Sequence, residues 1–274
     1  MEWSKLKNVI LLMLLCVNAI LLLLVGSQAR VSTRYQEETK EAALSVLEQG
    51  GISFLLDELP DDLTLPVVTV TRDRSNESAI ASALLGEVTL QEQNEVHPRY
   101  SGQNGTAEFS MNGSFTITLQ PGVYTLDGHD YDKSSQSCLK TMGLSGTLAD
   151  KRLDGSETVL TYFQNWEGAP VFSCPVTLRW QGEDLIQIEG SRLDGTAASS
   201  AEEELLSTST VLVRFLAVVN AGGYVCSRIE DMTSGYLSNS TTTRQVQLTP
   251  VWRFTTDTGA YYVDALTGDF TPAE

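Results

Sequence analysis

The segments LTPVWRF at residues 248–254 and AYYVDALTG at residues 260–268 stand on either side of the turn signal Asp257-Thr258-Gly259. Both segments are rich in aromatic and β-branched residues, which favour strands. A short glycine-containing connection between two such segments is typical of a hairpin. We therefore expect residues 245–255 and 260–264 to pair as a β-hairpin.

Upstream of this hairpin, the pattern predicts a helix followed by a strand. Ser200 and Glu203 have the spacing of a capping box, which marks the start of a helix. Apolar residues then recur at helical spacing to about Asn220, and the pair Gly222-Gly223 ends the helix. Residues 224–236 form the expected strand that leads into the hairpin.

The same order of helix, strand and hairpin is expected earlier in the chain. A helix is predicted at residues 75–85, a strand at residues 88–100, and a tight turn at Asn112-Gly113 between two paired segments, 107–111 and 115–119. The repeated order suggests an α+β fold with two similar lobes, each a helix packed on an antiparallel sheet. Further elements are expected as helices at residues 33–47 and 132–142, a strand at 65–72, and a meander of strands at 157–165, 171–180 and 184–193.

Near the N-terminus, residues 9–25 form a nearly unbroken apolar run. Together with residues 26–29 the run is long enough for a helix across a lipid bilayer. Lys5 and Lys7 precede it and the acidic remainder follows it, so we expect a single-pass protein of the plasma membrane with a cytoplasmic N-terminus and an extracytoplasmic C-terminal part. A cleavable signal peptide is the alternative, because Ser27-Gln28-Ala29 resembles a cleavage site.

The chain therefore divides into an anchor and an extracytoplasmic part with two expected lobes. The expected segments are a cytoplasmic tail at residues 1–8, a transmembrane anchor at 9–29, a juxtamembrane helix or linker at 30–50, a first lobe at 51–125 and a second lobe at 126–274.

Charge and cysteine content exclude several classes of function. The formal net charge is −17, and so acidic a surface repels phosphate backbones, which argues against nucleic-acid binding. Outside the apolar run the cysteines are Cys138, Cys174 and Cys226, an odd number at wide spacing. We expect them to be buried small hydrophobes, with a single disulfide as the alternative in an oxidising compartment.

A search for catalytic groups finds little. The two histidines are His97, in a polar strand, and His129, in the acidic run at residues 127–132. That run could hold a hard cation, but it lacks the EF-hand spacing, and a solvated loop is the simpler interpretation. No nucleophile elbow, zinc motif or phosphate-binding loop appears, so we expect no enzyme, no metal and no cofactor.

The distinctive segments are aromatic, and they resemble a known family. The start MEWSKLK at residues 1–7, the segment YFQNWEGAPVF at residues 162–172, and the hairpin at residues 248–268 together look like YycI. YycI proteins are membrane-anchored regulators encoded beside the YycG/YycF (WalK/WalR) two-component system of Gram-positive bacteria. Residues 200–270 also look like a PepSY-type module.

This resemblance implies two extracytoplasmic α+β lobes without catalysis. It also implies two partners, the sensor histidine kinase and a YycH-like sister protein, and a transmembrane helix that contacts the kinase. Asn18, the polar residue in the middle of the apolar run, either bonds within its own helix or contacts another helix.

The expected function is thus regulation of an envelope-sensing kinase in cell-wall homeostasis. The alternatives are an anchored PepSY-like binding or inhibitor module for an extracellular protease and an envelope enzyme built on residues 127–132. In the aromatic segments, strand-face core and partner surface are both open interpretations. The candidate partner-binding residues are Asn18, Val9, Leu12, Leu15 and Ile20 in the anchor, and Tyr162, Trp166, Trp252 and Tyr262 in the aromatic segments.

Overall fold

A computed structural model of the chain describes residues 13, 14, 18, 36–56, 59–92, 97–199, 203–240 and 244–273. Of the expected anchor it therefore includes Met13, Leu14 and Asn18, which are helical and exposed, and the remainder lies outside the described residues. In the part of the chain that is described, no helix combines the length and the apolar character needed to cross a membrane.

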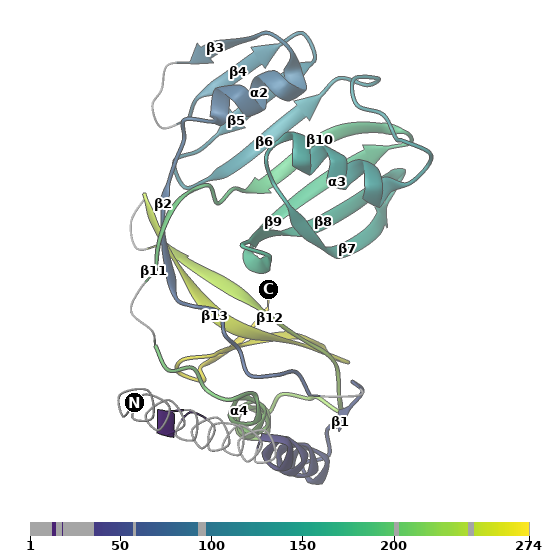
Figure 1. The fold of residues 1–274 in the computed structure, drawn as a ribbon. Coiled ribbons are helices and arrows are strands. Elements are labelled where there is room, and N and C mark those ends of the chain that lie inside the picture. The colour runs from purple at the N-terminus through teal and green to yellow at the C-terminus, as the bar shows by residue number, and fades with distance from the viewer. Residues whose placement is uncertain are drawn as a thin grey trace, which may run out of the picture.

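The fold is a mixture of helix and mainly antiparallel sheet, arranged as two lobes (Figure 1). The upper lobe consists of residues 74–192. The lower lobe consists of residues 36–73 and 193–273, so the upper lobe is inserted into it. The strands follow one another in the order β11-β2-β13-β12-β9-β10-β6-β5-β4-β3, and a short parallel contact between Tyr236 of β12 and Val171 of β9 joins the two halves.

In the upper lobe, α2 and α3 lie on the same face of the sheet (Figure 1). Fully buried Trp180, Tyr162 and Ile117 belong to the core between helices and strands, and Trp180 donates its indole N–H to Ser135 Oγ at 3.0 Å. The elements of this lobe are α2 (Glu77–Leu85), β3 (Val88–Glu92), β4 (Arg99–Gly102), β5 (Gly105–Phe109), β6 (Ser114–Leu119), α3 (Tyr131–Thr141), β7 (Gly146–Asp154), β8 (Glu157–Trp166), β9 (Ala169–Gln181) and β10 (Asp184–Ser191).

In the lower lobe, α4 and the helical residues 36–49 lie together at the end of the long β12–β13 pair (Figure 1). Phe215 of α4 stacks on Phe254 of β13 with ring centroids 4.4 Å apart, and Leu47 is buried in the same core. The elements are β1 (Ser53–Phe54), β2 (Val68–Arg72), β11 (Gly195–Ser199), α4 (Thr208–Gly222), β12 (Arg228–Ser240), β13 (Gln245–Thr256), β14 (Gly259–Asp264) and β15 (Phe270–Pro272).

Most of the elements expected from local patterns are confirmed. The Asn112-Gly113 turn joins β5 and β6, where Gly113 has a φ of 88° and the Asn112 side chain accepts a hydrogen bond from the Ser114 backbone N–H. The C-terminal hairpin is β13 and β14, and the meander is β8, β9 and β10.

The expected start of the last helix is wrong. Ser200 lies outside the described residues, Glu203 is not helical, and α4 begins at Thr208. The reason is a different cap. Ser207 accepts a hydrogen bond from the Thr210 N–H, and the Asp62 carboxylate accepts one from the Thr208 N–H at 2.8 Å, so the first free donors of the helix are satisfied there.

Two further expectations are corrected. The single strand expected at residues 88–100 is two strands, β3 and β4, paired antiparallel. The boundary expected at residues 125 and 126 falls between β6 and α3, which share one core and one lobe. The physical reason is the pairing of β2 with β11. One of these strands precedes the upper lobe in the sequence and the other follows it, and both belong to the lower sheet.

We expect Leu47→Ala to lower the free energy of unfolding by about 2–5 kcal/mol, because Leu47 is buried in the core that also contains α4. Val46→Ala is the matched control. Val46 is 44% exposed on the same helix, and its truncation should change stability by less than about 0.5 kcal/mol. Chemical denaturation of both variants measures the difference, and equal effects would mean that this helix does not belong to the lower core.

Candidate functional site

The two aromatic segments meet where the lobes face each other. Phe163 of β8 and Phe172 of β9 come from the upper lobe, and Arg253 of β13 and Tyr262 of β14 come from the lower lobe. Phe172 packs edge-on against Phe163 with centroids 5.2 Å apart and stacks on Tyr262 at 5.4 Å. We call these four residues the junction cluster.

The guanidinium group of Arg253 is the charged member of the junction cluster. The Arg253 guanidinium is 5.6 Å from the ring centroid of Phe163 and 5.9 Å from that of Phe172. It donates to Thr255 Oγ1 at 3.1 Å, while its Nε is buried without a partner among the described residues. Burial raises the pKa of the Tyr262 phenol, and the nearby Arg253 charge opposes that rise. The arrangement therefore holds two surfaces together by cation–π and ring contacts.

The expected partner-binding residues of these segments have different environments. Tyr162 is fully buried in the upper core and donates to Asp132 Oδ1 at 2.7 Å, and Trp252 is buried in the lower core. Trp166 is half-buried against a third apolar cluster, and Tyr262 belongs to the junction cluster, where it stacks on Phe172. Asn18 is helical and exposed. Val9, Leu12, Leu15 and Ile20 lie outside the described residues.

Strand alternation explains which residues the sequence analysis missed. Successive side chains of a strand point to opposite faces, so Phe163 and Arg253 point away from the cores that contain their neighbours Tyr162 and Trp252. The burial pattern alternates around these residues, over residues 160–164 of β8 and residues 252–256 of β13. The signal was present in the quoted segments, but without the fold it did not show which face meets the other lobe.

The acidic run at residues 127–132 has structural contacts. Asp130 caps α3 by accepting from the Lys133 N–H, Asp127 pairs with the Lys133 ammonium at 2.9 Å, and Asp132 accepts from Tyr162. In the described part of the chain no three metal-ligating side chains form a group. His129 is exposed in this loop with a φ of 64°.

Two of the three cysteines have the expected buried environment. Cys138 and Cys174 are buried and Cys226 is half-buried, and all three are free thiols. Burial raises the pKa of the Cys138 thiol to about 12, so it stays protonated and unreactive near neutral pH.

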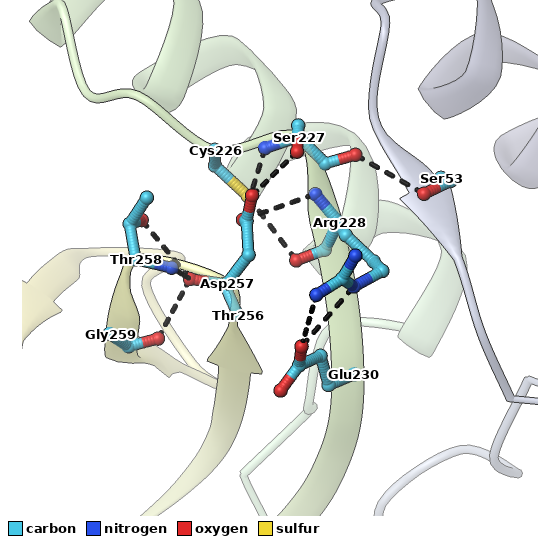
Figure 2. A network of polar contacts seen from close by, with 9 residues as sticks. All are labelled: Ser53, Cys226, Ser227, Arg228, Glu230, Thr256, Asp257, Thr258 and Gly259. Atoms are coloured by element: carbon cyan, nitrogen blue, oxygen red, sulfur yellow. Dashed lines mark hydrogen bonds and ion pairs between the residues drawn. The ribbon is translucent and has the colours of Figure 1, made fainter.

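A polar network joins β1, which follows the helical residues 36–49 in the chain, to the C-terminal hairpin. Figure 2 shows Asp257 in the β13–β14 turn, with its side chain directed toward Ser227 and Arg228 at the start of β12. Its carboxylate accepts hydrogen bonds from the backbone N–H groups of Ser227 and Arg228 and from the Ser227 hydroxyl. Ser53 of β1 in turn donates its hydroxyl to the Ser227 carbonyl at 3.2 Å.

Two surface hollows adjoin the lower core. One, of about 330 Å³, lies between the helical residues 36–49 and α4 and includes the exposed side chains of Val46 and Val213. The other, of about 390 Å³, is lined by residues 60–65, by Trp252 and by residues 232–234 of β12. At residues 231–234 the edge of β12 between β1 and β9 has no paired strand in the described sheet.

No protein-family model matches this chain. No curated protein matches it either. Among solved structures, an uncharacterised protein of Eubacterium rectale is 10% identical, with a TM-score of 0.49, over 81% of this chain and 90% of that one. The C-terminal domain of Bacillus megaterium YpeB is also 10% identical, with a TM-score of 0.40, over 75% of this chain and 99% of that one. At these values neither likeness assigns a family or a function.

The junction cluster predicts a measurable coupling between the lobes. In a double-mutant cycle of Arg253→Met and Phe163→Leu, we expect a coupling energy of about 0.5–2 kcal/mol, because each substitution removes the same cation–π contact. Unfolding free energies of the wild type, both single variants and the double variant give the value. Arg253→Met with Leu153→Ala, an exposed residue of β7, is the control pair and should be additive.

The Asp257 network predicts a pH dependence. Hydrogen bonds from Ser227 lower the pKa of the Asp257 carboxyl below its ordinary value, so its contribution to stability is present above the unfolded-state pKa and is lost as the pH falls through the folded-state pKa. Asp257→Asn should therefore lower the denaturation midpoint at neutral pH and have less effect near pH ~3. Asp150→Asn, at an exposed position of β7, is the control. The same loss at both pH values would contradict the assignment.

Proposed function

We propose that this protein is a non-enzymatic, membrane-anchored regulator of an envelope-sensing histidine kinase, which acts through its N-terminal helix together with a YycH-like partner. The proposal combines the apolar run at residues 9–25 and the YycI-like segments with one structural observation. The helical residues 36–49, which follow the anchor in the chain, share a core with α4, because Ala43 and Leu47 pack with Val211, Phe215 and Val219.

This packing provides a route from the outer lobes to the membrane. A helix that is buried in the lower core moves with that core, and the network around Asp257 connects β1, which follows that helix, to the C-terminal hairpin. Binding at the outer lobes can then bias the position of the anchor helix. Regulation of a kinase in this way needs only a difference of about 1–3 kcal/mol between its affinities for the two kinase states.

A second function is an anchored PepSY-like binding or inhibitor module for an extracellular protease. The open edge of β12 at residues 231–234 favours it, because an extended peptide can add to such an edge through backbone hydrogen bonds. The adjoining hollow with Trp252 has room for a side chain of that peptide.

The test of the first function is a membrane two-hybrid assay with the co-encoded kinase, together with a reporter of kinase output. We expect a signal from the full chain and from the anchor alone. Replacing residues 9–25 by poly-Leu should keep membrane insertion but abolish kinase control, because the helix surface is lost while its hydrophobicity is kept. No interaction from either the full chain or the anchor would overturn the proposal.

The coupling through the lower core has its own test in the same reporter strain. Leu47→Ala should reduce kinase control after correction for the measured protein level, while Val46→Ala should not, since Val46 lies outside the core. If neither variant changes the output while poly-Leu does, the anchor acts without the lobes. A protease-inhibition assay with the full chain in detergent decides the second function.

A further inference from the structure

The chain crosses between the lobes at two places that lie side by side. One is the end of β2 at Arg72, and the other is Arg192, which follows β10. The Asp73 N–H donates to the Asp194 carbonyl at 2.9 Å and so links the two crossings. The Arg192 N–H donates to the Gly113 carbonyl, in the β5–β6 turn, at 2.8 Å. Both arginines line one small cavity at this crossing.

These arginines have buried donors that no protein group satisfies. Nε and Nη1 of Arg72 and Nη1 of Arg192 are buried without a hydrogen-bond partner among the described residues. Arg192 is only 6% exposed, its Nη2 makes one long hydrogen bond of 3.4 Å to the Asp73 carbonyl, and its guanidinium lies 5.7 Å from the centroid of Phe109. Buried guanidinium groups without partners are costly, so a complementary group is expected beside them.

The carboxylates around the cavity are engaged elsewhere. Asp73 accepts from the backbone and the hydroxyl of Ser75, Glu77 forms an ion pair with Arg74 at 2.8 Å, and Asp194 accepts from the Asn76 amide. In the described residues neither Arg72 nor Arg192 forms an ion pair within 4.0 Å. The Asp73 carboxylate acts on Arg192 through its charge, but none of these carboxylates accepts a hydrogen bond from the unpartnered N–H groups of Arg72 and Arg192.

The size of the cavity limits its occupant. The space available to the centre of a water-sized sphere is about 10 Å³, which is room for a single water molecule or a monatomic ion. A phosphate, a sulfate or a peptide carboxylate with its chain does not fit without displacing Gly113, whose added Cβ would already be 3.3 Å from the Arg72 guanidinium carbon.

We propose that this cavity binds one small inorganic anion, chloride in the first instance, between the guanidinium groups of Arg72 and Arg192. The anion accepts the three unpartnered N–H groups and separates the two positive charges. Because it contacts both crossings, its occupancy stabilises the attachment of the upper lobe to the lower lobe. Burial lowers the pKa of the Arg72 guanidinium, because removal from water disfavours its charged form.

The test compares thermal unfolding of the full chain, kept in detergent, in sodium chloride and in sodium gluconate at equal ionic strength. An anion that binds only the folded protein raises Tm by mass action, on the order of 3–5 °C at tenfold excess over Kd. Arg72→Gln and Arg192→Gln should each abolish the difference between the two salts. Arg152→Gln, at an exposed position of β7, should keep it.

A second measurement does not depend on the folding of the variants. Crystals of the wild-type chain grown in bromide should give an anomalous peak between Arg72 and Arg192. A water molecule at that position, with no anomalous signal, would overturn the proposal. A chloride effect on Tm that is equal in the wild type and in folded Arg72→Gln would overturn it as well.

Discussion

The antiparallel pairing of β2 with β11 is the constraint on which the rest of the structure depends. Five residue pairs, from Val68 with Ser199 to Arg72 with Gly195, close the ladder over an insertion that contains the whole upper lobe. Gly195 has a φ of 153°, and a Cβ there would overlap the Thr71 carbonyl, so the ladder needs glycine at this end. Once the two strands are paired, both crossings between the lobes lie next to each other. The third apolar cluster, which combines Val70 of β2 with Val171 of β9 and with residues of β12 and β13, then fills the space beneath them.

The contacts between the lobes are individually weak, which is consistent with the proposed regulatory role. The cation–π and aromatic contacts of the junction cluster are each worth about 0.5–2 kcal/mol. The only strand pairing across the junction in the described residues is the parallel contact of Tyr236 with Val171, supported by the Ser173 and Ser238 hydroxyls at 2.7 Å. A junction of this strength is comparable to the coupling energy that a binding partner can supply. The two cores, in contrast, contain large fully buried side chains such as Trp180 and Phe215, and such close-packed interiors resist deformation.

Most helices and strands could be predicted from short sequence patterns, because a turn or a helix cap is determined by a few neighbouring residues. Asn112-Gly113 and the hairpin at Asp257 could be predicted from sequence for this reason, as could the helix at α3. The insertion could not, because β2 and β11 pair across more than one hundred intervening residues and neither strand contains information about its partner. Strand β7 was missed because nearly all of its side chains are exposed, so no alternation marks it. The start of α4 was placed too early because Ser200 and Glu203 fit a capping box, whereas the tertiary contact of Thr208 with Asp62 selects a later start.

The same alternation that hid the junction cluster separates stability from function in these segments. Tyr162 and Trp252 occupy core faces, so their substitution tests folding. Phe163 and Arg253, one residue away, occupy the faces that meet between the lobes, so their substitution changes the junction while the cores keep their packing. Because one face of such a strand packs in a core and the other packs against the second lobe, the sequence shows a continuous aromatic segment. The side chains of the two faces nevertheless have different roles. The contact between the lobes therefore depends on residues that are less buried than their neighbours in the sequence.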